Sequence, residues 1–179
     1  PKVMSAEEKG LAADPANDLE HAIILVEDSE LDDSTMGGFK MKHHRRVKVL
    51  SNEARGVGDI TLPIWKEWGT IHAFWAFVIS PDGSVQEFGK GALKEQLDVD
   101  VSGRDDLTEL KLALPGVEPG CIVDYGYSVT SEFNWAVNPI ALQRSWPIRN
   151  KRFRWIPFGG KRANYFLTGP KDAPVDIQS

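Results

Sequence analysis

The chain has 179 residues, of which 41% are hydrophobic and 26% are charged. At this length roughly 70% of the surface of the unfolded chain can be buried, so we expect one domain with one core. The single cysteine excludes an intramolecular disulfide scaffold and a cysteine-rich metal site. No apolar run approaches the roughly 18 residues that cross a bilayer, so we expect no transmembrane segment. The chain starts with Pro1 and shows no export signal, so we expect a part or a processed form of a longer protein.

The net charge of −5 is unevenly distributed along the chain. Residues 1–38 contain ten acidic side chains and two basic ones, whereas residues 142–162 contain seven basic side chains and no acidic one. Residues 40–48 add five more bases. These segments either attract one another within the fold or present faces of opposite potential to partners, and pairing within the fold is the simpler interpretation.

The two ends of the chain differ in composition from its middle. Ser5 followed by Glu8 has the spacing of a capping box, which predicts a short helix within residues 5–13. We otherwise expect residues 1–18 to form a flexible N-terminal segment. Residues 169–179 contain two prolines and no apolar cluster, which predicts a linker or tail.

Between these ends, over residues 19–168, side chains alternate with the period of two that is typical of β-strands. Residues 39–50 suit a long antiparallel strand with one face in solvent. Residues 70–79 are apolar on both faces, which predicts a central strand. The side chains that we expect to share one of its faces are Ile71, Ala73, Trp75, Phe77 and Ile79.

Turn signals separate the remaining strand candidates. Residues 80–83, Ser-Pro-Asp-Gly, place proline and glycine where a tight turn needs them, and residues 84–88 return as the second arm of a hairpin. Residues 121–130 alternate again. Shorter strand candidates are residues 20–26, 59–64, 110–114, 145–149, 153–157 and 165–167. Turn signals about every ten residues, with almost no helical periodicity, predict an all-β sandwich.

Three stretches, in this order, carry a resemblance to a known family. They are the basic strand ending in Val-Lys-Val-Leu, the run 71–79 followed by Ser-Pro-Asp-Gly-Ser-Val, and the block 114–127, Leu-Pro-Gly-Val-Glu-Pro-Gly-Cys-Ile-Val-Asp-Tyr-Gly-Tyr. Together they resemble the bacterial β-sandwich family called domain of unknown function 3857, over residues 19–157. Cys121 and Asp124 stand where that family usually has Ser and Glu.

The resemblance implies an immunoglobulin-like antiparallel β-sandwich in an extracytoplasmic setting, which means a periplasmic, secreted or outer-envelope protein. It also implies a transglutaminase-like, cysteine protease-like domain elsewhere in the parent chain, because the family usually precedes one. The family has no established activity and no agreed catalytic residues, so it assigns no active site to this chain.

Cys121, His72 and Asp124 have the residue types of a cysteine nucleophile triad. Activated thiols of this kind lie at a helix N-terminus, where the thiol pKa is lowered. Cys121 instead follows Pro-Gly and opens an alternating strand. We therefore expect Cys121 to be a small core residue and assign no catalytic residue.

The histidines and the aromatic residues near the C-terminus give no stronger signal. His43 and His44 are adjacent, so on a strand they point to opposite faces and cannot share one metal ion. His21 and His72 lack neighbours at ligand spacing, and we expect neither a metal nor a cofactor. Aromatic side chains among the bases of residues 144–158 are compatible with nucleic acid, but the acidic composition argues against that partner.

Trp65 and Trp68 are the candidate binding residues. They lie in Ile-Trp-Lys-Glu-Trp, between a proline and a glycine, which is a loop-like setting. If both side chains are exposed, they form a stacking platform for sugar rings or an anchor for a partner. Burial in the core is the competing interpretation.

The preferred hypothesis is a non-catalytic accessory module that docks on, or presents substrate to, a transglutaminase-like domain of the parent chain. The alternative is a glycan-binding module that uses Trp65 and Trp68 at a sandwich edge or loop. An enzyme in its own right is disfavoured, because every candidate constellation has a structural explanation.

Overall fold

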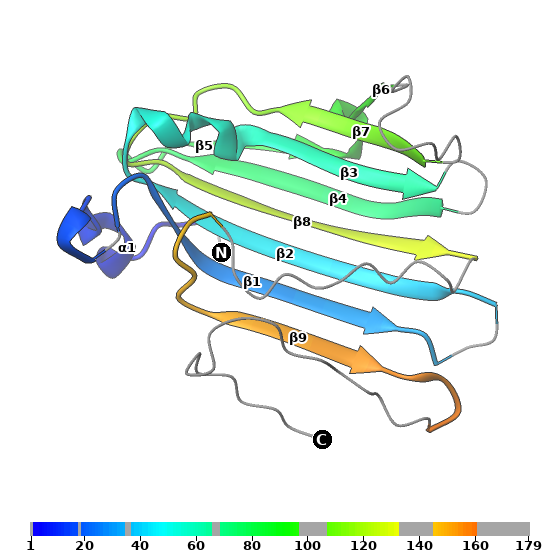
Figure 1. The fold of residues 1–179 in the computed structure, drawn as a ribbon. Coiled ribbons are helices and arrows are strands. Elements are labelled where there is room, and N and C mark those ends of the chain that lie inside the picture. The colour runs from blue at the N-terminus through cyan, green and yellow to red at the C-terminus, as the bar shows by residue number, and fades with distance from the viewer. Residues whose placement is uncertain are drawn as a thin grey trace.

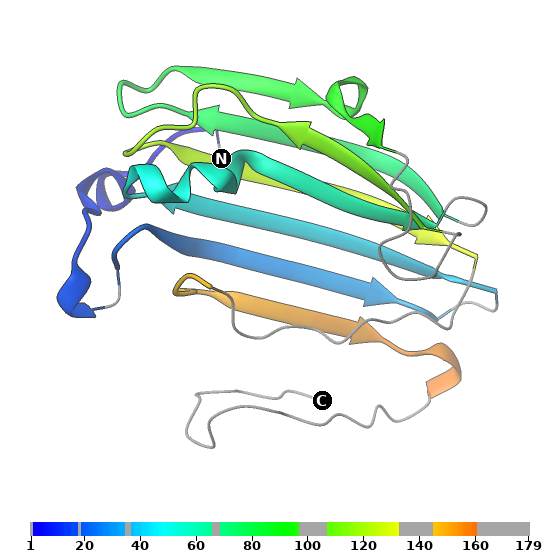
Figure 2. The ribbon, with the colours of Figure 1, turned by 45° about the horizontal axis from the view of Figure 1, so that its top comes forward.

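The computed structural model describes residues 2–17, 19–34, 37–65, 69–96, 107–132 and 145–160. Within these residues the strands form two sheets that lie one over the other, as Figure 1 and Figure 2 show. The large sheet has six strands in the order β5-β4-β8-β2-β1-β9, and the small sheet has three in the order β3-β7-β6. No helix in this part of the chain is long and apolar enough to cross a bilayer.

The strands of the large sheet are longest in its middle. They are β1 (Ala22–Asp32), β2 (Phe39–Val49), β4 (Gly69–Ile79), β5 (Val85–Gly89), β8 (Ile122–Ser131) and β9 (Lys151–Ile156). The small sheet contains β3 (Asp59–Trp65), β6 (Lys94–Gln96) and β7 (Leu107–Ala113). The described helical segments are α1 (Ala6–Gly10) and the 3₁₀ turns Pro15–Asn17, Asn52–Gly58, Lys90–Ala92 and Phe158–Gly160.

Strand pairing confirms the all-β, two-layer sandwich. Neighbouring strands of the described part of the large sheet run antiparallel, except that β9 runs parallel to β1. The described sheets hold six and three strands, whereas those of a constant-type immunoglobulin domain hold four and three. The fold therefore belongs to the predicted class but divides its strands less evenly.

The β4–β5 hairpin closes through the predicted turn. Gly83 has φ of 92° and its N–H donates to the carbonyl of Ser80 at 2.9 Å. Asp82 Oδ1 accepts the Ser84 N–H at 2.8 Å. Glycine is suited to this position because side chains disfavour a positive φ, so the local sequence determines the turn.

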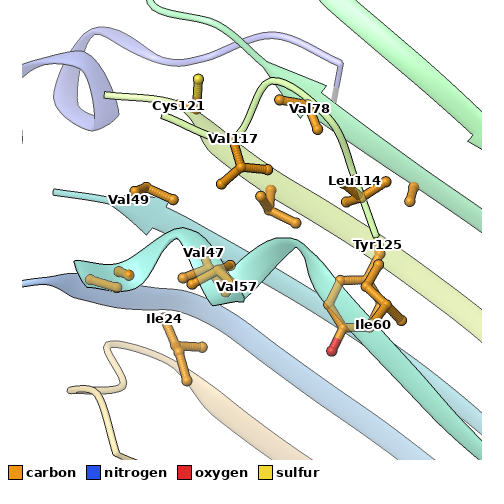
Figure 3. Packing of buried hydrophobic residues seen from close by; sticks show 14 of the residues in the cluster. Ile24, Val47, Val49, Val57, Ile60, Val78, Leu114, Val117, Cys121 and Tyr125 are labelled. Carbon is orange, nitrogen blue, oxygen red and sulfur yellow. The ribbon is translucent and has the colours of Figure 1, made fainter. Parts of the chain in front are cut away.

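The main hydrophobic core lies between the two sheets (Figure 3). Val47 and Val123 come from the side of the large sheet that faces the small one, which we call the inner face. They belong to one cluster with Ile60 of β3 and Leu114, which follows β7. Cys121 is 2% exposed within this cluster, which confirms the prediction of a core cysteine.

A second apolar cluster lies on the opposite side of the large sheet, which we call the outer face. Met4, 4% exposed, packs there with Ile23, Ile79 and Ile122. Figure 1 shows α1 at the end of the large sheet where β2 ends and β8 begins. The N-terminal residues, predicted as flexible, thus cover part of the outer face in this structure.

The predicted capping box is confirmed at the start of α1. The Glu8 N–H donates to Ser5 Oγ at 3.1 Å, and the Ser5 N–H donates to Glu8 Oε2 at 2.7 Å. Two N–H groups that a helix start leaves without partners are thereby satisfied.

The strand predictions need three corrections. A bulge between Ile71 and Ala73 shifts the pairing of β4 with β8, so Ile71 shares the inner core rather than the face of Trp75. One face of β2 was expected in solvent, but Arg46 and Lys48 on that face are each 2% exposed because the N-terminal segment covers them. Residues 145–149 form no strand and contribute one isolated bridge to β1. The candidates 165–167 and 169–179 lie outside the described residues.

Candidate binding site

The two tryptophans singled out from the sequence are only partly located. Trp65 is the last residue of β3 and pairs in register with Leu107 of β7. Trp68 lies outside the described residues. Their role in binding stays a prediction.

Cys121, His72 and Asp124, the residue types of a cysteine nucleophile triad, do not lie together in the structure. Cys121 belongs to the inner core, whereas Asp124 lies on the outer face and is 1% exposed. His72 Nε2 lies 2.7 Å from the Thr130 hydroxyl near the far end of β8. About 30 Å of strand separates that point from Cys121.

His43 and His44 point to opposite faces, as predicted. His43 Nδ1 lies 2.9 Å from the Ser29 hydroxyl, and its ring contacts Tyr127 at a centroid distance of 5.1 Å. His44 instead lies beside Asp124 on the outer face. Among the described residues, no group of three or more His, Cys, Asp or Glu side chains could hold a metal ion.

A chain of charged side chains fixes the N-terminal segment on the outer face. The Arg46 guanidinium donates to Asp124, to Glu8 Oε1 at 2.7 Å and to the Val3 carbonyl at 2.9 Å. Asp124 Oδ1 lies 2.7 Å from His44 Nε2. The hydrogen bond from Arg46 lowers the pKa of Glu8 to about 2, so this carboxyl is ionised at neutral pH.

Lys48 lies next to this chain and is buried. Its ammonium donates to the Gly120 carbonyl at 2.6 Å and to Met4 Sδ at 3.5 Å. Burial lowers the pKa of Lys48, because the charged form loses its hydration. The N-terminal segment therefore shields cationic groups that a bare sheet face would leave in water.

Beyond the N-terminal segment, the outer face forms a groove of about 530 Å³. Five strands contribute to it: β1, β2, β4, β8 and β9. The described residues that line it are Asp28, Ser29, Glu30, Lys42, His43, His44, Ala73, Trp75, Tyr127, Ser128, Arg152 and Arg154. We call this depression the outer-face groove.

Acids and bases alternate across one side of the outer-face groove. Asp28 Oδ2 accepts a hydrogen bond from Arg152 at 3.0 Å. Glu30 accepts from Lys42 at 2.8 Å and from Arg154 at 3.3 Å. The Lys42 hydrogen bond holds the pKa of Glu30 below its usual value. The side chains form a row of adjacent donors and acceptors with nearly balanced charge.

Trp75 forms the other side of the outer-face groove. Its ring stacks on Phe77 at 5.2 Å and 29°, and the His44 ring lies 5.4 Å away. A Cβ at Gly126 would lie 2.7 Å from Trp75 Cζ2, so the glycine allows the indole to lie close to the sheet. These contacts hold the indole in one orientation.

Sequence reasoning missed this site. The bases of residues 40–48 and the acids of residues 1–38 were recognised as segments, but the order of strands in the sheet decides which of their side chains meet. Trp75 was expected on a face of β4, and nothing in the sequence placed it opposite β9. The one available signal was the complementary charge of the two segments.

A family model and several solved structures are similar to this chain. The model of DUF3857, described as a domain of unknown function with solved structure, matches residues 36–157. No curated protein matches the chain. Among solved structures, a protein described as a "putative protease" from Parabacteroides distasonis is similar, with a TM-score of 0.63 and 17% identity. The similarity covers 74% of this chain and 28% of that protein.

An M1 zinc metallopeptidase from Deinococcus radiodurans also matches, with a TM-score of 0.34 and 13% identity over 68% of this chain and 23% of that one. This likeness is too weak to support an argument. The likeness to the Parabacteroides protein extends to the fold alone, and the chain spans 28% of the length of that protein. The family model, by contrast, matches more than half of the chain, and so this protein belongs to the DUF3857 family.

Proposed function

We propose that this chain is a non-catalytic accessory domain that docks on a transglutaminase-like domain of an extracytoplasmic bacterial protein. The observation that carries the proposal is an exposed tryptophan on a sheet edge. Trp155 is 38% exposed and lies on β9, which pairs only with β1 among the described strands. Trp155 is also the one large aromatic side chain among the exposed hydrophobic residues of the described chain.

An edge strand of this kind suits docking. Among the described strands one edge of β9 has no partner, and the backbone N–H and C=O groups of such an edge can pair with a strand of another domain. A partly exposed tryptophan at the same edge is the residue type that most often dominates binding energy at an interface. The edge therefore offers both backbone pairing and an aromatic anchor to a neighbouring domain.

The positions of Cys121 and Asp124, two residue types common in active sites, support a non-catalytic role. Cys121 is buried in the inner core, and its Sγ contacts the Gly116 carbonyl at 3.6 Å. Asp124 is engaged by Arg46 and His44 on the other face. These contacts stabilise the fold and leave neither residue open to a substrate. The similarity to part of a longer protein fits a domain that works beside another.

The test uses the parent protein with and without this domain, and with Trp155→Ala. Removal of the domain is expected to lower the stability and activity of the transglutaminase-like domain. Trp155→Ala is expected to weaken the association of the separately expressed parts at least tenfold, about 1.4 kcal/mol or more. Calorimetric titration of one part into the other measures this.

Val85→Ala is the matched control. Val85 is also 38% exposed and lies on β5, the edge strand at the opposite side of the large sheet. Its truncation should leave the affinity unchanged. The proposal would be contradicted if Trp155→Ala and the unchanged chain bound with equal affinity. It would also be contradicted if removal of the domain left the stability and activity of the transglutaminase-like domain unchanged.

A further inference from the structure

We propose that the outer-face groove is a binding site for a neutral oligosaccharide, with Trp75 as the stacking platform. The site shares β9 with the proposed docking edge through Arg152 and Arg154 but does not include Trp155, so this inference does not rest on the proposed docking function. It also places glycan recognition at a residue other than Trp65 and Trp68.

The Trp75 indole is held in place before any ligand arrives. It lies over Gly126, stacks on Phe77 and contacts the His44 ring, and Ala73 beside it is small and exposed. Trp75 is half-buried, and the C–H face of a sugar ring can pack on the part of the indole that lines the groove. Because the indole is already oriented, little conformational entropy is lost on binding.

The row of charged side chains opposite Trp75 matches hydroxyl groups. Each sugar hydroxyl donates one hydrogen bond and accepts others. Asp28 beside Arg152, and Glu30 beside Lys42 and Arg154, place acceptors next to donors at separations of 2.8 to 3.3 Å. Adjacent hydroxyls of one sugar ring can therefore bind an acid and a base together.

The charge balance of the row favours a neutral ligand over an anionic one. Two carboxylates face three cationic side chains, and each cation already contacts a carboxylate. An anionic ligand would bring its charge close to Asp28 and Glu30 and would compete with both for the same bases. A neutral polyol makes charge-assisted hydrogen bonds without breaking these pairs.

The position of the groove on the sheet argues against an extended peptide. The central strands β8, β2 and β1 are each paired on both sides where they line the groove, so a peptide strand cannot add to them. The volume of about 530 Å³ lies within the range of small-ligand sites, about 300 to 1,000 Å³.

Calorimetry and intrinsic tryptophan fluorescence with named oligosaccharides test the proposal. The neutral probes are cellohexaose, maltohexaose and chitohexaose, and the anionic probe is hexagalacturonic acid. At least one neutral probe is expected to bind with saturation, and more tightly than the anionic one. A flat response to all neutral probes, or tighter binding of the anionic probe, would overturn the proposal. A peptide that saturates the site while the neutral probes do not would do the same.

Two sets of variants locate the binding. Trp75→Leu is expected to weaken binding at least tenfold, while Trp155→Ala leaves it unchanged. Because Trp75 also packs on Phe77, the second set, Asp28→Asn and Arg152→Gln, alters exposed or half-buried side chains that leave the core intact. Each is expected to weaken binding at least threefold, with an unchanged circular dichroism spectrum. Binding that survives both sets would show that the ligand lies elsewhere and would refute the assignment.

Discussion

Gly126 is the residue on which the Trp75 indole rests. An added Cβ would lie 2.7 Å from Trp75 Cζ2 and 3.0 Å from the His43 carbonyl, so Gly126→Ala must displace the indole or the strand. We expect a loss of about 1 to 3 kcal/mol in the free energy of unfolding, measured by urea denaturation. The tryptophan emission should shift as well, because the indole moves.

Gly89→Ala is the matched control for this substitution. Gly89 is the last residue of β5 in the same sheet, and a Cβ there would meet nothing within 4 Å. The free energy of unfolding of Gly89→Ala should differ from that of the unchanged chain by less than about 0.5 kcal/mol, as for other surface substitutions. Equal effects of the two substitutions would mean that Trp75 does not depend on the space above Gly126.

Asp124 is a buried carboxylate that pairs with Arg46. The free energy of unfolding depends on this pairing. Arg46→Met removes the guanidinium and leaves a carboxylate that is 1% exposed, so we expect a loss of about 3 to 5 kcal/mol in the free energy of unfolding. The double variant Arg46→Met/Asp124→Leu removes both charges. It should be more stable than Arg46→Met alone, because the carboxylate buried at position 124 is removed as well.

Thermal and urea unfolding of the two single variants and the double variant complete the cycle. A double variant that loses the sum of the single losses would mean that the two side chains act independently. That result would contradict the buried pairing of Asp124 with Arg46.

At the scale of single residues, sequence reasoning succeeded where the nearest neighbours along the chain decide the outcome. Strand alternation correctly placed Cys121 in the core and His43 and His44 on opposite faces. It also placed Trp75 on one face with Phe77 and Ile79, but it could not predict the contacts of Trp75 with His44 and Gly126, which come from other strands. The alternation of one strand contains no information on which strand lies two positions away.

At the scale of elements, the N-terminal segment makes stability depend on pH through Glu8. The Arg46 hydrogen bond lowers the pKa of Glu8 from 4.5 to about 2. A lowered carboxyl pKa contributes stability that is present above about pH 4.5 and is lost as the pH falls towards about 2. We expect this contribution to be about 1 to 2 kcal/mol, since solvent screens a partly exposed pair.

The variant Glu8→Gln isolates the charge, because glutamine can keep the capping hydrogen bond. Its free energy of unfolding should be lower than that of the unchanged chain at neutral pH, and the difference should vanish near pH 2. Glu7→Gln is the control, since Glu7 is 75% exposed and pairs with Arg149 at the surface. Urea denaturation at a series of pH values measures both, and parallel curves for the two variants would contradict the assignment.

The elements themselves were predicted unevenly. The strands β2, β4 and β8 and the capping box at Ser5 follow from local alternation and spacing, and the structure confirms each. The bulge after Ile71 and the parallel pairing of β9 with β1 could not be predicted, because both are properties of strand pairing. Residues 145–149 look like a strand but pair through a single bridge, since the regular pairing with β1 starts only at Lys151.

At the scale of the whole molecule, the uneven charge of the sequence is explained by pairing across strands. Glu8 meets Arg46, Glu27 lies 2.6 Å from Arg45 and 3.0 Å from Lys151, and Asp28 meets Arg152. The acidic first part of the chain thus pairs with both basic segments. The open question from the sequence, between internal pairing and opposite faces for partners, is answered for these residues in favour of internal pairing.

The shared core predicts that the two sheets unfold as one unit. Leu62 of β3 is 2% exposed and belongs to the same cluster as Val123 of β8. Leu62→Ala should cost about 2 to 5 kcal/mol, because it leaves a cavity between the sheets. Native-state amide hydrogen exchange should show the same loss of protection in β3 and in β8, since the slowest amides of both exchange through global unfolding.

A loss of protection confined to the small sheet would contradict this prediction. It would mean that β3 and β7 detach while the large sheet persists, with its inner face open to water. The many apolar side chains on that face, including Val47 and Val78, make such a state costly, because each would lose its partner surface. The small sheet is therefore expected to unfold only when the large sheet does, and the outer-face groove depends on the same cooperative unit.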